Sequence, residues 1–189
     1  MSDMVFEYQL REFTVGEYHR LAEIGLLRPE ERVELLDGAI VEMSPIGNLH
    51  WRRHGRIVEY LIGALSNRAF VVGQSSLQLG DKNEPQPDVA ILARQCAAPS
   101  DKAPSPDEIY ALVEISDTSL QKDVGPKLRL YARYGIADYL VVDLNAEVLL
   151  HYHEPHQLGY GACDRLDKGA SFQLGALPGI TLSTEAFLN

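Results

Sequence analysis

The sequence predicts an α/β (α+β) protein in which a mixed β-sheet is flanked by helices. Residues 110–115 and 139–143 are nearly continuous apolar runs, typical of strands that are buried on both faces of a sheet. A helical pattern separates them, and the order strand, helix, strand implies a parallel pair with a right-handed crossover. Asp37-Gly38 between two apolar runs predicts an antiparallel hairpin. No domain boundary is visible, so we expect residues 1–189 to form one domain.

Composition and charge restrict the functional class. The chain is 46% hydrophobic and 23% charged, as in globular proteins, and its net charge is −10. Binding to nucleic acid by charge alone is therefore unfavourable, whereas an enzyme acting on nucleic acid through a local site and a metal is compatible with this charge. Met1 to Met4 show no basic start of a signal peptide, and no apolar run approaches the ~18–20 residues of a membrane span. We expect a cytoplasmic protein that does not contact the membrane.

The first half of the chain predicts two helices and four strands. Thr14 followed by Glu17 forms a capping-box pattern, and Gly25 is placed to end the helix that begins there. Residues 48–68 carry the apolar stripe of a second helix. The predicted strands of this half are residues 33–36, 39–43, 70–72 and 75–79.

The second half begins with a short strand at residues 88–92, followed by a Pro/Ser-rich surface loop at 97–107. A third helical stretch follows the strand at 110–115, and Gly125-Pro126 is expected to open its clearest part. The segment from residue 148 onward is expected to form short edge strands.

Two carboxylates are expected at one end of the sheet. Asp88 begins a strand and Glu114 lies near the end of the next central strand, so the two side chains can lie side by side. Such a pair repels unless a cation is present, and Mg²⁺ commonly binds one or two carboxylates. The alternative is a strand-terminal Asp beside a turn and a Glu paired with an arginine. Glu114 is costly to bury unpaired, and Lys127 could deliver an ammonium to the same end, which favours metal-assisted phosphodiester hydrolysis.

These motifs, taken in order, resemble the PD-(D/E)xK nuclease superfamily, and most closely a bacterial "putative restriction endonuclease" family long catalogued as a domain of unknown function. The similar segments are residues 33–38, 43–45, 50, 87–88, 113–119, 123 with 127, 130–136, 139–143, 154–155, 159–160 and 177–179. The resemblance covers nearly the whole chain and implies a restriction-endonuclease-like core with a metal site at one end of the sheet.

The resemblance also implies roles for individual residues. Asp88, Glu114 and the main-chain carbonyl of Ile115 would bind Mg²⁺ or Mn²⁺. The superfamily lysine usually lies two residues after the Glu, where this chain has Ser116, so Lys127 is expected to replace it. Glu34 matches a third site carboxylate, or is an exposed hairpin residue. The residues expected to support the site are Ser116, Thr118, Asp123 and His50; the alternative for His50 is a helix-terminal histidine with a backbone partner.

The expected function is therefore that of a metal-dependent endonuclease whose partner is nucleic acid. DNA is the expected substrate and a homodimer the expected assembly, because cleavage of a duplex suits two sites. The alternative is a non-catalytic nucleic-acid or protein-interaction module that retains the nuclease fold. The net charge of −10 and the missing strand lysine favour the alternative. Lys127 distinguishes the enzyme from the non-catalytic module. If the protein is an enzyme, the Lys127 ammonium should lie near Asp88 or Glu114, whereas Lys122 and Lys168 should not. Lys127→Met should then stop hydrolysis while largely preserving folding and metal binding.

Two other clusters leave alternatives open. Trp51-Arg52-Arg53-His54 with Arg56 either contacts a phosphate backbone or is an ordinary exposed helix face. His151, His153 and His156 invite a zinc interpretation, but a solvated edge strand is expected because no acidic or cysteine partner completes the set. Tyr131, Tyr134 and Tyr139 are expected to pack in the core.

Overall fold

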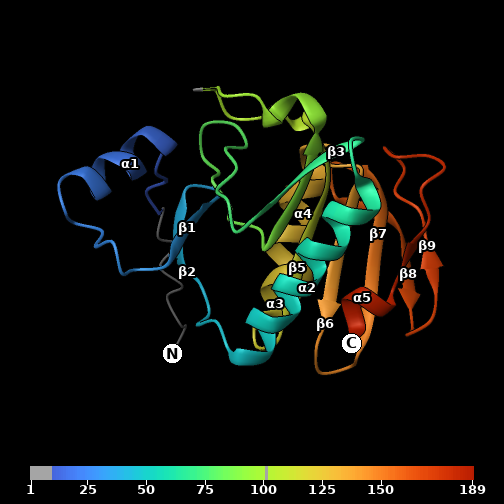
Figure 1. Ribbon diagram of the computed structural model, residues 1–189. Helices are drawn as coiled ribbons and strands as arrows, with labels where there is room; N and C mark the ends of the chain where they lie inside the picture. The colour runs from blue at the N-terminus through green and yellow to red at the C-terminus, as the bar shows by residue number, and fades with distance from the viewer. Residues whose placement is uncertain (1–9, 101) are drawn as a thin grey trace, which may run out of the picture.

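A central six-stranded mixed sheet dominates the computed structural model, which describes residues 10–100 and 102–189 (Figure 1). Its strand order is β3-β4-β5-β6-β7-β8; β5 and β6 are parallel, and the other neighbours are antiparallel. The strands are β3 (Ala69–Gly73), β4 (Val89–Ala93), β5 (Ile109–Ser116), β6 (Asp138–Asp143), β7 (Val148–His156) and β8 (Gly159–Leu166). The predicted fold class is confirmed. Met1 to Met4 and residue 101 of the predicted surface loop lie outside the described residues.

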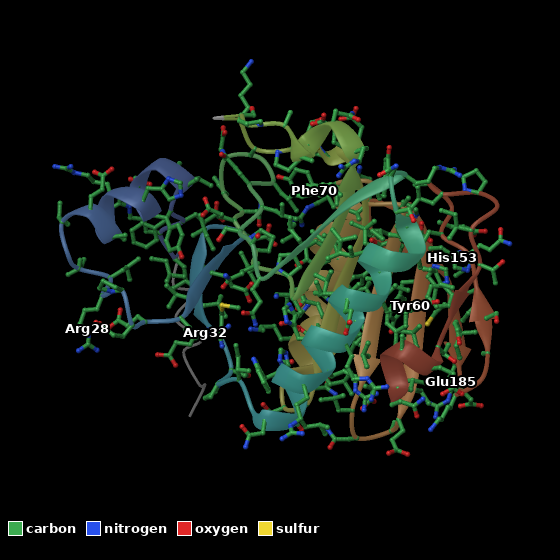
Figure 2. The ribbon with its side chains drawn as sticks, viewed as in Figure 1. Arg28, Arg32, Tyr60, Phe70, His153 and Glu185 are labelled. Carbon is green, nitrogen blue, oxygen red and sulfur yellow. The ribbon has the colours of Figure 1, made fainter. Side chains whose placement is uncertain are left out.

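Helices cover both faces of this sheet. Figure 1 shows α2 (Asn48–Leu65) and α5 (Glu185–Leu188) on one face, and α3 (Leu120–Lys122), the π-helical turn η3 (Asp123–Lys127) and α4 (Leu128–Arg133) on the other. Each face has its own apolar core. A small sheet of β9 (Ser171–Phe172) and β10 (Leu182–Ser183) joins the α2 side, where the Tyr60 hydroxyl accepts a hydrogen bond from the main-chain N–H of Ser183 at 2.7 Å (Figure 2).

The N-terminal part docks a helix and a hairpin beside the sheet. Helix α1 (Val15–Glu23) begins with the predicted Thr14–Glu17 capping box, and Gly25 follows its end with φ of +76°. Strands β1 (Val33–Leu36) and β2 (Ala39–Glu42) form the predicted hairpin. Main-chain hydrogen bonds between Leu35 and Glu84, of 2.8 and 3.3 Å, attach the hairpin to the loop that precedes β4.

The predicted strand at residues 75–79 is wrong. Leu77 and Leu79 are buried, and their N–H groups donate to the main-chain carbonyls of Pro85 and Asn83, at 2.9 Å each. The returning segment contains Pro85 and Pro87, which have no N–H to donate, so the two segments cannot form a regular ladder. The chain is therefore an extended loop here, and it leads directly into β4. The Pro/Ser-rich loop lies between two short 3₁₀ turns, η1 (Arg94–Ala97) and η2 (Pro106–Glu108).

The prediction of short edge strands after residue 148 is correct for β9 and β10, which have two residues each, and for the edge position of β8, but it is wrong for β7 and for the length of β8. β7 and β8 are 9 and 8 residues long, and β7 lies inside the sheet between β6 and β8. The interior position of β7 could not be predicted, because β7 mixes polar and apolar side chains whereas an interior strand is usually more uniformly apolar.

Among the described residues, no helix has the combined length and apolar character that a membrane crossing requires. Both cysteines are free thiols: Cys96 is half-buried and Cys163 is exposed.

The tight turn of the β1–β2 hairpin gives a stability prediction. Gly38 has φ of +75°, and a Cβ there would lie 2.6 Å from Glu12 Cβ; Gly25 has a similar φ of +76° with nothing within 4 Å. Gly25→Ala should cost about 1–2 kcal/mol of unfolding free energy from backbone strain alone. Gly38→Ala should cost clearly more, because strain and overlap combine. Urea unfolding of both variants measures the difference; equal losses would show that the Glu12 contact does not constrain the hairpin.

Candidate active site

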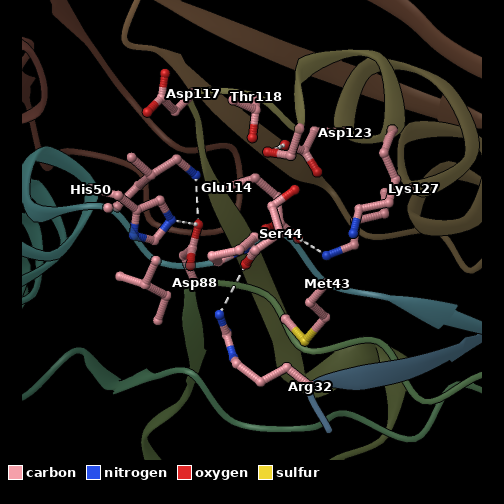
Figure 3. A pocket seen from close by; sticks show the side chains of 16 residues that line it. Arg32, Met43, Ser44, His50, Asp88, Glu114, Asp117, Thr118, Asp123 and Lys127 are labelled. Atoms are coloured by element: carbon pink, nitrogen blue, oxygen red, sulfur yellow. Dashed lines mark hydrogen bonds and ion pairs between the residues drawn. The ribbon is translucent and has the colours of Figure 1, made fainter.

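Asp88 and Glu114 lie next to each other at one end of the central sheet. Val89 of β4 pairs with Val113 of β5, so the residue before β4 lies beside Glu114. Both carboxylates are largely buried, and both line a small pocket with a volume of about 50 Å³, which is room for a few water molecules (Figure 3). The other side chains of the pocket include Arg32, Met43, Ser44, His50, Asp117, Thr118, Ser119, Lys122, Asp123 and Lys127.

Asp88 is held by groups from three segments. Its Oδ2 accepts hydrogen bonds from the main-chain N–H of Ile115 at 2.7 Å and from His50 Nε2 at 3.0 Å. Its main-chain carbonyl accepts from His54 Nε2 at 3.0 Å and from the N–H of Gln74 at 2.9 Å. The side chain of His50 therefore binds the Asp88 carboxylate and not a backbone group. These contacts fix Asp88 against both α2 and β5.

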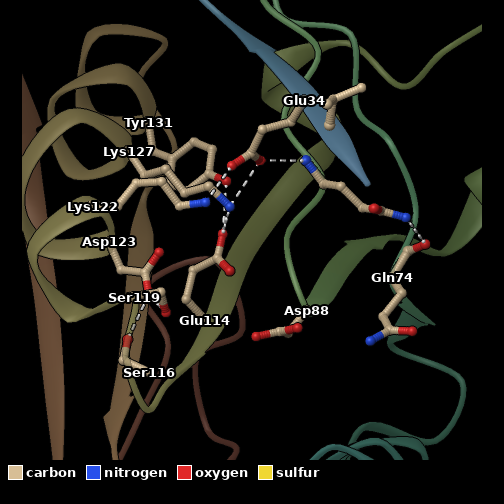
Figure 4. Close-up of polar contacts among 12 residues, drawn as sticks. Glu34, Gln74, Asp88, Glu114, Ser116, Ser119, Lys122, Asp123, Lys127 and Tyr131 are labelled. Atoms are coloured by element: carbon tan, nitrogen blue, oxygen red, sulfur yellow. Dashed lines mark hydrogen bonds and ion pairs between the residues drawn. The ribbon is translucent and has the colours of Figure 1, made fainter. Parts of the chain in front are cut away.

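Glu114 belongs to a buried ion-pair cluster (Figure 4). Its Oε1 accepts hydrogen bonds from Lys127 Nζ at 2.8 Å and from the Tyr131 hydroxyl at 3.0 Å. Lys127 Nζ also lies 3.0 Å from Glu34 Oε2, and Lys122 Nζ lies 3.0 Å from Glu34 Oε1. The expected proximity of Lys127 and Glu114 is thus present. Lys122 pairs with Glu34, and Figure 4 shows its side chain next to that of Lys127.

Glu34 is a buried member of this cluster, not an exposed hairpin residue. Its side chain is 0% exposed, and the N–H of Gln86 donates to its Oε2 at 3.2 Å. Burial raises the pKa of Glu34, but Lys127 and Lys122 outweigh that effect, so the net direction is downward. Glu34 is therefore ionised at neutral pH and fixes both lysines.

A π-helical turn lets both lysines reach Glu34. The N–H of Leu128 donates to the carbonyl of Asp123, five residues earlier, so Lys122 and Lys127 stand at the two ends of one wide turn. In an α-helix, residues five apart are rotated by roughly 140° and face different directions. Pro126 has no N–H and lies inside the turn. The predicted third helical stretch is present and begins at Leu120. The expectation that Gly125-Pro126 opens its clearest part is wrong, because both residues lie inside the π-helical turn and the regular helix α4 begins at Leu128.

Asp123 anchors the start of this helical segment. Its Oδ2 accepts hydrogen bonds from Ser116 Oγ at 2.7 Å and Ser119 Oγ at 2.6 Å, and its main-chain carbonyl accepts from the Tyr139 hydroxyl at 3.1 Å. Ser116, at the position of the superfamily lysine, thus joins β5 to the helical segment. Thr118 is exposed and only lines the pocket.

The cluster contains more carboxylates than ammonium groups. Burial raises the pKa of Glu114 well above its usual value; Lys127 opposes this shift, whereas Asp123, Asp88 and Glu34 add to it. Burial lowers the pKa of Lys127, but Glu114, Glu34 and Asp123 outweigh it, so the net direction is upward. Lys127 is therefore a permanent cation at neutral pH. Further positive charge in the pocket would relieve the remaining repulsion around Glu114.

The oxygen donors beside Glu114 suit a hard divalent cation. Both hydrogen bonds to Glu114 end on Oε1, and both to the Asp88 side chain end on Oδ2, which leaves one oxygen of each carboxylate for another partner. The N–H and C=O of a strand residue point to the same side, so the Ile115 carbonyl is directed, like its N–H, toward Asp88. Among the described residues, no three or more His, Cys, Asp or Glu side chains converge to hold a metal. Two carboxylates with a carbonyl match Mg²⁺, which keeps several waters.

Sequence reasoning missed three groups of the cluster. Tyr131 was expected only to pack in the core, although it follows Lys127 by four residues and so shares its helix face. Lys122 could not be found, because only the π-helical turn brings it to Glu34. The main-chain N–H of Gln86 carries no side-chain signal at all.

The histidines of β7 differ from expectation. His151 is buried, and its Nε2 lies 2.7 Å from Asp138 Oδ1 on β6, while His153 Nε2 lies 3.3 Å from Asp164 Oδ2 on β8. The expectation of a solvated edge strand without acidic partners is wrong, because the carboxylates come from the two neighbouring strands.

Comparisons with known proteins agree with this architecture. The sequence profile of the Uma2 family, described as "Putative restriction endonuclease", matches residues 15–185. A crystal structure described as a "putative nuclease belonging to DUF820" from Anabaena variabilis is similar, with a TM-score of 0.71 and 16% sequence identity. The match covers 93% of this chain and 97% of that chain. No curated protein matches the sequence. The structural likeness supports the restriction-endonuclease-like fold of the sheet and its helices.

The burial of Lys127 changes the expected effect of Lys127→Met on folding. The Lys127 side chain is 2% exposed and its ammonium contacts two buried carboxylates, so removal of the ammonium should cost about 3–5 kcal/mol of unfolding free energy near pH 7. The loss should shrink as pH falls, because a protonated carboxyl group no longer needs the ammonium, and for Glu114, whose pKa is raised, the loss begins to shrink above about pH 4.5. Adding Glu114→Gln to Lys127→Met should restore part of the stability. Urea unfolding at several pH values tests this; a small loss that does not vary with pH would contradict a buried ion pair.

Glu114→Gln should change how stability depends on pH. Because the folded-state pKa of Glu114 is raised, the folded protein binds a proton more tightly than the unfolded chain. This group therefore stabilises the fold below about pH 4.5, and that stabilisation is lost, by ~1.4 kcal/mol per pH unit, as pH rises toward the folded pKa. Relative to the wild type, Glu114→Gln should gain stability as pH rises from 4.5 to 8. A difference between the two proteins that stays constant over this range would refute the assignment.

Proposed function

The chain belongs to the Uma2 family, whose description is "Putative restriction endonuclease", and from this premise we propose that it is a metal-dependent nuclease that hydrolyses phosphodiester bonds. The observation that carries the proposal is the hydrogen bond of 2.8 Å between Lys127 and Glu114, with Asp88 on the neighbouring strand. Two acids and one cation at a sheet end suit metal-assisted hydrolysis of a phosphodiester.

Asp88, Glu114 and the main-chain carbonyl of Ile115 would hold Mg²⁺ or Mn²⁺. When bound, such an ion polarises a phosphoryl oxygen and lowers the pKa of a coordinated water. His50 and the Ile115 N–H, which bind Asp88 Oδ2, would keep the other oxygen of that carboxylate toward the pocket. Lys127 and Tyr131, which bind Glu114 Oε1, would do the same for Glu114.

Lys127 would act as a hydrogen-bond donor and not as a base. Its pKa is raised by Glu114, Glu34 and Asp123 despite burial, so it keeps its proton at neutral pH. In the proposed reaction its ammonium orients the attacking water and stabilises the negative charge that develops on the phosphate. Lys127 would thus supply the ammonium that the superfamily usually has at the position of Ser116, whose hydroxyl here binds Asp123. Glu34 positions Lys127 from the opposite side.

DNA is the proposed substrate, and a homodimer would bring two such sites into one assembly. We further propose that residues 1–189 act as one nuclease-like domain in the cytoplasm. Light scattering over a range of concentrations tests the dimer, and a monomer throughout that range would exclude it.

One observation favours the alternative of a non-catalytic interaction module that retains the fold. Among the described residues, no three or more acidic, His or Cys side chains come together to hold a metal ion, so Asp88 and Glu114 would be the two side-chain ligands. Binding of Mn²⁺ and nucleic acid without cleavage of single- or double-stranded DNA or RNA would support this alternative and contradict the first proposal.

Asp88→Asn tests the proposal directly. The amide keeps the size of the side chain but loses the charge, so we expect weaker Mn²⁺ binding by calorimetry and a loss of about 10³-fold in cleavage rate. Asp164→Asn, at an exposed carboxylate on β8, is the matched control and should retain both properties. Unchanged cleavage by Asp88→Asn in the presence of Mg²⁺ would sink the proposed site.

A further inference from the structure

The first two turns of α2 present a positive surface beside the candidate site. Residues 50–56 contain three arginines and two histidines and no acidic residue, in a chain whose net charge is −10. Arg52 and Arg56 are exposed, and within residues 10–100 and 102–189 neither forms an ion pair. Trp51, which precedes Arg52 in the same helix, is also exposed, and together Trp51, Arg52 and Arg56 form what we call the α2 basic patch.

Trp51 gives this patch an unusual chemical character. It is the single tryptophan of the chain, and 65% of it is exposed. A surface groove includes Trp51, Arg52 and Arg56 together with Leu49, which is 52% exposed. Glu59 and Asn189 also line this groove, and Glu59 is its single acidic side chain. A flat aromatic ring flanked by guanidinium groups matches the surfaces on which unpaired bases stack while arginines contact the phosphates.

The helix that carries the patch also contacts the candidate site, through a different face. His50, adjacent to Trp51, binds the Asp88 side chain, and His54, between Arg52 and Arg56, binds the Asp88 carbonyl. The helix is held from its other side, where Arg53 Nη1 donates to the carbonyl of Phe187 in α5 at 2.7 Å. Arg53 is thus engaged within the protein, whereas Arg52 and Arg56 are available to a ligand.

We infer that the α2 basic patch binds single-stranded nucleic acid, with Arg52 and Arg56 on its phosphates and Trp51 stacked on one of its bases. The inference rests on the proposed nuclease function for its purpose, but binding at the patch is separable from hydrolysis. A continuous duplex keeps its bases stacked on each other, so it offers Trp51 no free face, and it should bind more weakly.

The fluorescence of Trp51 reports directly on this surface, because the chain has no other tryptophan. The experiment titrates the full chain, with divalent metals chelated to prevent hydrolysis, with a DNA strand of about 12 nucleotides. A hairpin duplex of the same composition is titrated in parallel. We expect quenching by the single strand with at least tenfold tighter binding than by the duplex, and an affinity that falls steeply with salt.

Substitutions separate the patch from general electrostatics. Arg52→Gln and Arg56→Gln should each make the slope of log affinity against log salt shallower by about 0.7, the value for one phosphate contact on a single strand. Arg165→Gln, at an exposed arginine on β8, is the matched control and should leave the slope unchanged. Trp51→Ala, measured by anisotropy of a labelled strand, should weaken binding by about tenfold or more while circular dichroism remains that of the wild type.

Several results would overturn the inference: no quenching by the single strand, equal or tighter binding of the duplex, or an effect of Arg165→Gln equal to that of Arg52→Gln. A change in Trp51 emission on dilution of the protein alone would also overturn it, because a second copy of the chain would then cover the patch. Quenching without any cleavage by the wild type would support the patch and contradict the proposed catalysis. Cleavage without quenching would support the proposed catalysis and contradict binding at the patch.

Discussion

The ammonium of Lys127, held between Glu114 and Glu34, is the interaction on which the arrangement of the site depends. It joins three parts of the chain: the helical segment that carries the lysine, the central strand β5 and the N-terminal hairpin. A buried charge without partners is strongly unfavourable, so each part is needed to keep the other two in place. The cluster is therefore a structural joint as well as the proposed catalytic centre, and its stability and its chemistry are not independent.

The backbone around this joint is specialised. An ordinary α-helix would direct Lys122 and Lys127 to different sides, and Pro126 would disrupt its hydrogen bonds. The π-helical turn accommodates the proline and brings both cations to Glu34. On the opposite side of the pocket, α2 uses two histidines one turn apart to fix Asp88. The two carboxylates are thus held by different helices on different faces of the sheet.

The sequence predicts those parts of the site that depend on local patterns. Asp88, Glu114 and the approach of Lys127 follow from strand ends and from a helix stripe, and the structure brings Lys127 to Glu114. The burial of Glu34 could not be predicted, because it depends on where the hairpin docks through Leu35 and Glu84. The prediction that His151 lies on a solvated strand without an acidic partner was wrong for a related reason. Its partner Asp138 is on a neighbouring strand, and a single sequence does not reveal which strands pair. The strand predicted at residues 75–79 is a loop for a similar reason: the segment that it pairs with contains Pro85, which has no N–H to donate, and the sequence does not reveal that pairing.

The position of Glu34 has a consequence for how the chain acquires its structure. Glu34 and Lys127 are 93 positions apart in the sequence, and Glu114 is only 13 positions before Lys127. At ~5–20 residues per second, a ribosome completes Lys127 roughly 5–20 s after Glu34. For nearly all of that interval the chain contains neither Lys122 nor Lys127, the two lysines that pair with Glu34. The hairpin can already attach through Leu35 and Glu84, but the ion pairs of Glu34 form only after residues 120–127 have been synthesised. The nascent chain thus completes its acidic centre late.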